Sequence, residues 1–455
     1  MATNVTISGG TAGPTVTIPF TSVAIATAAQ NAIAAISGAI AGGFGTVYIP
    51  TAAGNQTLPS AFIGAVQNTA PLATAYNVLP AAFSTFINNN AAGQLTTFIG
   101  AAPETVVAGP GALTLFLNAA TSGTSQVFQS AGGSYFGNPF GAFNNGTNIQ
   151  IDGGGTPGGA SSYIDASLGS TTVGLSGGAN VEVKPGGAAT VTALSGTDYI
   201  TAAAGATSTA AAVTVGASSG ATVQYTPLGG NGFINPGAGS AIIFASTLGS
   251  ETLTAGTGSS TVFGNSGFFT GGAAGHNSFV SSTITGAATM IGGGNSDVVI
   301  LNGSNDVGGS GNGTGVIVSA SPTNTTLGGE TLFGGSGSGS LLGGQAGGNT
   351  FDFGSGVFSA TGFHTFTSGV GFTTANNYTE TVGGGTVTIT DWLPQAASTT
   401  FDKFNLATGV TTTAAVTVAG SGTNVTTNVV LSDGTKVSFQ SFTASAVTQH
   451  GTYLS

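Results

Sequence analysis

Short apolar runs recur about every nine residues through the middle of the chain, and segments rich in glycine, serine and asparagine separate them. The clearest series of candidate strand residues is Val223, Phe233, Ile242, Leu253 and Val262. Strands this short cannot bury a core alone, so each must pair with the equivalent strand of the next winding. Glycine and asparagine accept the backbone conformations of the tight corners between them. The period predicts a parallel β-roll or β-solenoid, with two strands and about 18 residues in each coil.

The period divides the chain into three predicted regions. Residues 147–358 carry it and are predicted to form the glycine-rich solenoid, whereas residues 1–146 and 359–455 lack it. We therefore predict a mainly β protein, with an N-terminal α+β module in residues 1–146 and a C-terminal antiparallel β cap in residues 359–455. The N-terminal module, rich in alanine and phenylalanine, is the candidate for the contact between copies of the chain.

The N-terminal region mixes strand and helix patterns. Residues 4–8 and 15–19 alternate as strands do, and residues 60–67 and 72–88 are predicted to be helices. Residues 23–42 have apolar side chains at helical spacing, and the segment is long and uncharged enough to span a bilayer.

A buried helix is nevertheless the favoured interpretation of residues 23–42. The segment contains Gln30 and Asn31, and no aromatic or basic anchor flanks it. Ser22 can cap its start and Gly42 can end it. We therefore expect no membrane insertion.

Alternating runs replace the nine-residue period near the C-terminus, at residues 386–390, 415–419, 425–431 and 436–439. Asp433 and Gly434 form a typical hairpin turn between the last two runs. These features predict the antiparallel cap.

The charge balance excludes several functions. The chain has 3 Lys+Arg against 14 Asp+Glu, a formal net charge of −11. We expect no nucleic-acid partner, because three basic residues are too few to neutralise a phosphate backbone. The chain has 0 Cys, which removes disulfides and thiolate chemistry. The first 20 residues have neither a basic start nor an apolar stretch, and therefore predict no secretory signal peptide.

Some nonapeptides resemble the RTX, or haemolysin-type calcium-binding, repeat G-G-x-G-x-D-x-hydrophobic-x. The unit GGGNSDVVI at residues 292–300 has its aspartate at Asp297, whereas AGTGSSTVF at 255–263 has Ser260 there. The units GGAAGHNSF at 271–279 and GGQAGGNTF at 343–351 match one another. We interpret all of them as degenerate RTX-like repeats.

The C-terminal segments ITDW, FDKFNL and VVLSDGTKVSF are similar to the sequence that follows the repeats in type I secreted bacterial proteins. The resemblance, over residues 250–455, implies an uncleaved C-terminal secretion signal and an extracellular or cell-surface location.

The resemblance also implies calcium at the glycine-rich corners, where aspartates and glycine carbonyls supply oxygen ligands. Most corners here have glycine, serine or asparagine instead, so we expect few calcium sites. One partial site is predicted at Asp297 and Asp306, with the carbonyls of Gly292 and Gly294. The alternative is that these aspartates cap backbone N–H groups in turns.

Catalytic motifs are weak in this sequence. The pattern GxSxG occurs at residues 174–178 and 216–220, without the strand–helix context that a nucleophile needs. Polysaccharide lyases share the β-helix fold, but the acidic residues here are dispersed and the chain has no arginine. His276, His364 and His450 are isolated. We therefore predict that the protein is not an enzyme.

The sequence best fits an extracellular structural protein that assembles with copies of itself into a filament, surface layer or biofilm matrix. A surface with few charges does not keep copies apart, and an uncapped solenoid end exposes strand edges. The alternative is a monomeric adhesin that binds a glycan or cell surface through Tyr199, Tyr225 and Phe233. An ice-binding face would need threonine at one strand position in every coil, and the sequence varies there.

Overall fold

A computed structural model describes the fold. It covers residues 3–7, 15–49, 51–57, 64–68, 74–76, 85–89, 96–100, 105–109, 113–117, 125–130, 135–137, 143–152, 162–166, 169–185, 188–202, 213–227, 232–244, 251–264, 266–281, 287–302, 306–320, 329–362, 366–367, 371–372, 375–380, 385–392, 402–406, 408–421 and 424–441. The chain forms two compact units, Met1–Ile242 and Ile243–Ser455.

The first unit begins with the predicted strands and helix. Strands β1 (Thr3–Ile7) and β2 (Val16–Phe20) pair antiparallel, and helix α1 (Val23–Ala41) follows. The Ser22 hydroxyl accepts a hydrogen bond from the backbone N–H of Ile25 at 3.4 Å, and Gly42 caps the other end. These contacts confirm the predicted helix limits.

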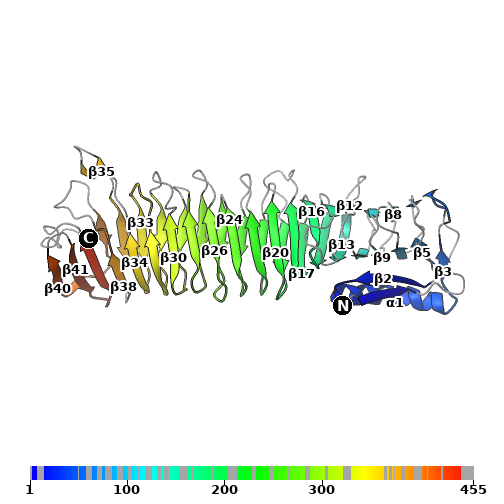
Figure 1. Cartoon of the computed structure of the whole chain (residues 1–455), viewed down its shortest axis with the longest axis horizontal. Helices are drawn as coiled ribbons and strands as arrows, with labels where there is room; N and C mark the ends of the chain where they lie inside the picture. The colour runs from blue at the N-terminus through cyan, green and yellow to red at the C-terminus, as the bar shows by residue number, and fades with distance from the viewer. Residues whose placement is uncertain are drawn as a thin grey trace. The chain divides into compact units, whose positions relative to one another are not determined.

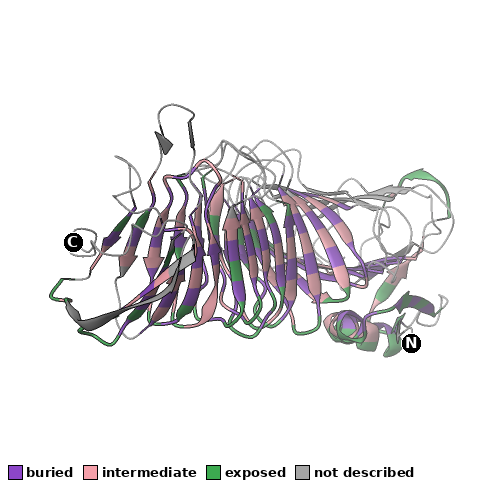
Figure 2. Ribbon diagram, turned by 60° about the vertical axis from the view of Figure 1, so that its left-hand side comes forward, coloured by how far each residue is buried: buried purple, intermediate pink, exposed green. Residues whose placement is uncertain are grey.

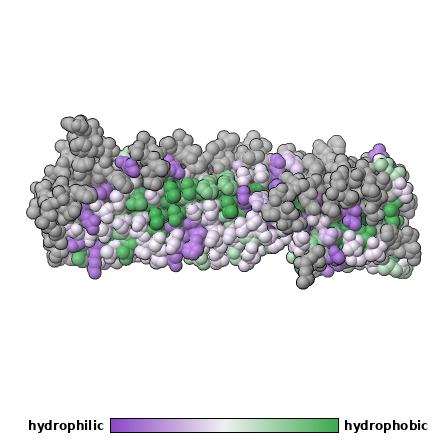
Figure 3. All heavy atoms as spheres, in the orientation of Figure 1, coloured by the Kyte–Doolittle hydropathy of each residue, from purple (hydrophilic) through white to green (hydrophobic). Residues whose placement is uncertain are grey.

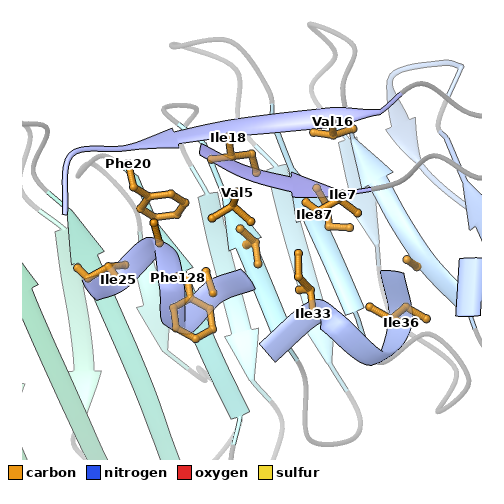
Figure 4. Close-up of a cluster of buried hydrophobic side chains, with 14 of the residues drawn as sticks. Val5, Ile7, Val16, Ile18, Phe20, Ile25, Ile33, Ile36, Ile87 and Phe128 are labelled. Carbon is orange, nitrogen blue, oxygen red and sulfur yellow. The ribbon is translucent and has the colours of Figure 1, made fainter. Parts of the chain in front are cut away.

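One side of α1 packs against the solenoid (Figure 4). The buried residues of the helix are Ile25, Ala26, Ala29, Ile33, Ile36 and Ile40. They meet outward-facing side chains of the first coils, which include Ile87 and Phe128, and the inner side of the β1–β2 hairpin. By length and composition α1 could cross a membrane, but here its apolar side lies in this cluster.

The rest of the first unit is a parallel solenoid of two sheets, which we call the odd-strand and even-strand sheets (Figure 1). The odd-strand sheet contains β3 (Thr46–Tyr48), β5 (Gly64–Asn68), β7 (Thr85–Asn88), β9 (Thr105–Ala108), β11 (Ser125–Gln129), β13 (Phe143–Asp152), β15 (Gly169–Ser176), β17 (Ala188–Ser195), β19 (Val213–Ala217) and β21 (Gly232–Asn235). The even-strand sheet contains β4 (Gly54–Asn55), β6 (Thr74–Tyr76), β8 (Thr96–Gly100), β10 (Leu113–Leu117), β12 (Tyr135–Gly137), β14 (Ser162–Ala166), β16 (Asn180–Pro185), β18 (Thr197–Ala202) and β20 (Thr222–Pro227).

The solenoid therefore starts well before residue 147, where the period placed its start. The described parts of the predicted helices at 60–67 and 72–88 are the strands β5, β6 and β7. Helix prediction was wrong there because alanine-rich segments favour helices locally, whereas pairing with neighbouring coils decides the outcome. Of the predicted α+β module, the described residues before β3 contain the hairpin and the helix α1.

The second unit is also a two-sheet solenoid. Its odd-strand sheet contains β23 (Glu251–Thr254), β25 (Gly267–Thr270), β27 (Ala288–Ile291), β29 (Val307–Gly309), β31 (Thr331–Phe333), β33 (Thr350–Phe353), β37 (Asn377–Glu380) and β39 (Lys403–Asn405). Its even-strand sheet contains β24 (Ser260–Gly264), β26 (Ser278–Ser281), β28 (Val298–Leu301), β30 (Val316–Ala320), β32 (Ser338–Leu342), β34 (Val357–Thr361), β38 (Thr386–Ile389) and β42 (Lys436–Ser441). Strand β22 (Ser240–Phe244) spans the division between the units, and β35 (Phe366–Thr367) pairs with β36 (Gly371–Phe372).

The antiparallel cap is smaller than predicted. Strand β38 pairs in parallel with β34 and β42, so the predicted strand at 386–390 belongs to the solenoid. Only β40 (Thr412–Ser421), β41 (Asn424–Leu431) and β42 form antiparallel pairs among the described residues of this region beyond β36. The predicted turn at Asp433 and Gly434 joins β41 to β42, and Gly434 has φ +92°.

Along many of the described strands, buried residues alternate with more exposed ones (Figure 2), and the buried set forms the core. In the odd-strand sheet of the second unit one inward row is Leu253, Phe269, Met290, Gly308, Leu332, Phe351, Tyr378 and Phe404. The rings of Phe351 and Tyr378 stack with centroids 4.9 Å apart. The core is thus a ladder of like side chains, one from each coil.

Candidate functional site

The Asp297 carboxylate lies at a corner of the second unit and is fully buried. Its Oδ1 accepts the backbone N–H of Asn277 at 2.7 Å. Its Oδ2 accepts the backbone N–H groups of Gly293 at 2.7 Å and Gly294 at 2.8 Å, and the Asn277 side-chain amide at 3.0 Å. Four donors match the roughly four acceptor positions of a carboxylate.

The same contact recurs at both corners. A polar side chain just before a strand, or at its second residue in the case of Asp198, accepts the backbone N–H of the residue aligned with it one coil earlier. The donor and acceptor residues are Ala179 and Asp198, Ser260 and Asn277, Asn277 and Asp297, Ala288 and Asp306, Asn349 and Asn376, and Asn376 and Asp402. We call these contacts the corner ladder. It supplies acceptors to N–H groups that the strand pairing leaves at the corners.

The two matching nonapeptides use one geometry at opposite corners. The Asn277 amide donates to the Gly272 carbonyl at 3.2 Å, and the Asn349 amide donates to the Gly344 carbonyl at 3.1 Å. Asn277 precedes an even-numbered strand and Asn349 an odd-numbered one. The shared sequence therefore encodes a local corner rather than one place on the solenoid.

Asp306 belongs to the opposite corner from Asp297. It precedes β29 of the odd-strand sheet, and its carboxylate accepts the Ala288 N–H at 2.9 Å and the Ser281 hydroxyl. The two aspartates thus have separate sets of donors. Within the described ranges, no group of three or more His, Cys, Asp or Glu side chains lies close enough to hold a metal ion.

The carbonyl groups of Gly292 and Gly294, which were predicted to bind calcium, lie against glycines of the next coil. A Cβ on Gly311 would lie 1.9 Å from the Gly292 carbonyl oxygen, and one on Gly313 would lie 1.8 Å from that of Gly294. These carbonyls are directed at the backbone of the next coil, and the Asp297 oxygens face N–H donors. This arrangement does not match an oxygen cage around Asp297. The calcium site at these four residues stays a prediction.

In the part of the chain that the structure describes, two further buried carboxylates have hydrogen-bond donors for only one of their two oxygens. Asp198 accepts the N–H groups of Gly178 and Ala179 through Oδ1, and Glu330 accepts that of Gly344 through Oε2. Both residues are fully buried, and neither Oδ2 of Asp198 nor Oε1 of Glu330 has a hydrogen-bond partner among the described residues.

These surroundings alter the acidity of both groups. Burial raises the pKa of Asp198 to about 7, and the charge of Asp152 adds to that effect. Burial also raises the pKa of Glu330, with a smaller contribution from Asp306. The folded protein therefore favours the neutral form of each side chain.

A third buried carboxylate, Asp152 on β13, fastens the N-terminal segment to the solenoid. It accepts the backbone N–H and the hydroxyl of Thr21, and the backbone N–H of Ser22 at 2.8 Å. Ser22 is also the N-cap of α1, so Asp152 places a negative charge at the start of that helix.

Among the described residues, the weak catalytic motifs do not bring together a set of catalytic side chains. Ser176 of the first GxSxG pattern is buried and hydrogen-bonds to the Ser195 hydroxyl. His276 is exposed at a corner, and its Nδ1 lies 2.9 Å from the Asn295 carbonyl oxygen. His364 and His450 lie outside the described residues. The absence of enzyme activity stays a prediction.

Sequence reasoning missed most of the corner ladder, including Asp198, Asn376 and Asp402, and it also missed Glu330. The usable signal is a polar residue directly before an alternating apolar run, as in Asp198-Tyr199-Ile200. Its aligned donor, Ala179, lies 19 residues earlier. A motif built around aspartate alone cannot find it.

Together the winding and the corners define a parallel β-solenoid whose corners are closed by side chain-to-backbone hydrogen bonds. Comparison of the chain with protein-family models, with curated proteins and with solved structures gives no match.

Proposed function

We propose that this chain is an extracellular structural protein that assembles with copies of itself into a filament, surface layer or matrix. The observation that carries the proposal is where the charges lie. Among the residues whose burial the structure describes, seven of the chain's 14 acidic residues are buried: Asp152, Asp198, Glu251, Asp297, Asp306, Glu330 and Asp402. The exterior therefore has even fewer charges than the composition indicates, and little electrostatic repulsion keeps copies apart.

The strand edges of the first unit support the proposal. Strand β3 pairs with β5, and β4 pairs with β6, and the described residues place no strand on the other side of either. Unpaired edges are sites where a further strand can add.

Electron microscopy of the purified protein near neutral pH, with calcium and again with a chelator, tests this function. We expect ordered fibres or sheets in both conditions. Order only with calcium would make metal binding the trigger of assembly. Dispersed single particles in both conditions would contradict the proposal.

The alternative, a monomeric adhesin, has fewer aromatic candidates than predicted. Tyr225 is 1% exposed and belongs to the core, whereas Phe233 is 51% exposed. Tyr199 is half-buried, so Phe233 is the one exposed side chain of the three predicted residues. A single exposed ring offers less contact area than the aromatic clusters that dominate binding sites. Glycan-array binding by dispersed particles would favour this alternative.

We further propose secretion by a type I route, from the resemblance of the C-terminal segments. Two of their residues, Trp392 and Phe439, pack with ring centroids 4.7 Å apart. Fusing residues 359–455 to a reporter, in a bacterium with a type I exporter, tests the route. Reporter retained inside the cell would contradict it.

A further inference from the structure

Among the described residues, the outer side of the even-strand sheet of the second unit carries exposed apolar side chains. We call its outward side chains Phe244, Phe263, Val280, Val298, Ile300 and Ile317 the apolar face. Phe244 is 39% exposed, Phe263 39% and Ile317 43%. Figure 3 shows hydrophobic side chains gathered over these strands.

The residues of the apolar face lie in register. Phe263 aligns with Val280, Val280 with Ile300, and Val298 with Ile317 on successive strands. The rings of Phe244 and Phe263 stack, with centroids 5.5 Å apart and planes 10° apart. The side chains therefore form rows that repeat at the strand spacing of about 4.8 Å.

The first unit buries a comparable surface. On its odd-strand sheet the outward side chains Ala65, Ile87, Val107 and Phe128 are at most 2% exposed, because the β1–β2 hairpin and α1 lie over them. In the second unit no described segment covers the apolar face in this way. Apolar surface in ordered rows marks an interaction site.

We infer that the apolar face binds the same face of a second copy of this chain. The inference deepens the proposed function, because it names one surface through which copies associate. Two observations select this occupant. The face has no charged side chain, although the chain has a net charge of −11, so copies meet there without carboxylate repulsion.

The second observation is the repeat itself. Rows spaced by one strand separation fit a surface with the same spacing, so that the side chains of one interdigitate with those of the other. A second copy presents that spacing along its whole face. Pairing of identical faces gives a closed, two-fold contact.

Analytical ultracentrifugation of the full chain with the double substitution Phe263→Ser and Ile317→Ser tests the inference. We expect the wild-type chain to dimerise and the variant to weaken the dimer about a hundredfold. The matched control is Phe268→Ser with Phe333→Ser on the odd-strand sheet. These phenylalanines are 45% and 37% exposed, but Thr289 and Asp352 lie beside them in their rows. The control is expected to dimerise as the wild type does.

A second measurement does not depend on the stability of the serine variant. The chain has 0 Cys, so a single Phe263→Cys substitution places the only thiol on the apolar face. Mild oxidation is expected to give at least about tenfold more disulfide-linked dimer than Phe268→Cys does. Equal crosslinking of the two variants would overturn the inference.

The outcomes separate this inference from the proposed function. A wild-type chain that stays monomeric at high concentration would overturn the inference, as would binding of this face to neutral phospholipid vesicles instead. Ordered assemblies that persist unchanged in the Phe263→Ser, Ile317→Ser variant would leave the proposed function standing and reject this contact. A dimer through the face without larger assemblies would support the contact and reject the proposed function.

Discussion

The backbone N–H of Asn277 donates to Oδ1 of Asp297 at 2.7 Å, and Asn277 is the residue aligned with Asp297 one coil earlier. Each such contact ties a coil to its predecessor through a side chain as well as through the strand ladder. Hydrogen bonds between protein groups thereby hold the corner.

Replacing Asp297 tests this role. Asp297→Ala leaves the N–H groups of Gly293, Gly294 and Asn277 buried without their acceptor, which we expect to cost about 3 kcal/mol of unfolding free energy. Urea denaturation followed by circular dichroism measures the loss. The control Asp433→Ala, at an exposed hairpin turn, is expected to change stability by less than about 1 kcal/mol. Equal effects would contradict a special role for Asp297.

Stability is expected to rise as the pH is lowered from 8 to 5. Burial in the folded state raises the pKa of Asp198 to about 7, well above its ordinary value in an unfolded chain, so between these two values the folded chain binds more protons than the unfolded chain. The stabilising contribution is complete below the unfolded pKa and is lost as the pH rises through the folded pKa. The part gained between pH 8 and pH 5 is on the order of 3 kcal/mol.

Thermal melting across this pH range provides the measurement. Asp198→Asn keeps the size of the side chain but removes its charge, so the variant is expected to melt at higher temperature at pH 8 and to show a weaker pH dependence. The raised pKa of Glu330 acts in the same direction, and Glu330→Gln is expected to reduce the remaining slope. A wild-type protein that is most stable at pH 8 would refute this account.

Successive coils approach so closely at the glycine corners that one added methyl group is expected to lower the stability of the fold considerably. Gly313→Ala would place its Cβ 1.8 Å from the Gly294 carbonyl oxygen, so the two coils must separate. We expect a loss of about 3 kcal/mol or more in denaturant titrations. Gly38→Ala in α1 meets nothing within 4 Å and is expected to stabilise by about 0.5–1 kcal/mol.

The carboxylate of Asp152 holds the N-terminal segment in place. Asp152→Ala removes the acceptor of the Thr21 and Ser22 N–H groups, so α1 is expected to open more often from the solenoid. Hydrogen exchange of the α1 amides is expected to accelerate about tenfold to a hundredfold, whereas that of β28 stays unchanged. Uniform acceleration in both segments would indicate global destabilisation instead.

The sequence predicted the features that a repeat or a local pattern encodes. Residues with a helical or alternating pattern, such as Ile25, Ile33 and Leu253, lie as expected because periodicity directly encodes which side faces the core. Strands β5 to β7 were missed because their pairing partners lie in other coils. No local pattern reveals such partners in alanine-rich sequence.

The candidate site was predicted in part. The aspartates at 297 and 306 do lie at corners, and both accept backbone N–H groups, as the capping alternative proposed. Their placement at opposite corners depends on how many residues each coil contains. Asp297 and Asp306 are 9 residues apart, which is close to half a coil, since Ser278 aligns with Val298 after 20 residues. Two residues half a coil apart therefore lie beside different sheets.

The parallel ladder has a mechanical consequence. Hydrogen bonds between successive coils run along the direction in which coils stack, so tension in that direction loads one coil boundary at a time. A detached coil of 20 residues, as between Ser278 and Val298, releases about 70 Å of chain. Under load, each unit is therefore expected to lengthen in discrete steps while the remaining coils keep their shape.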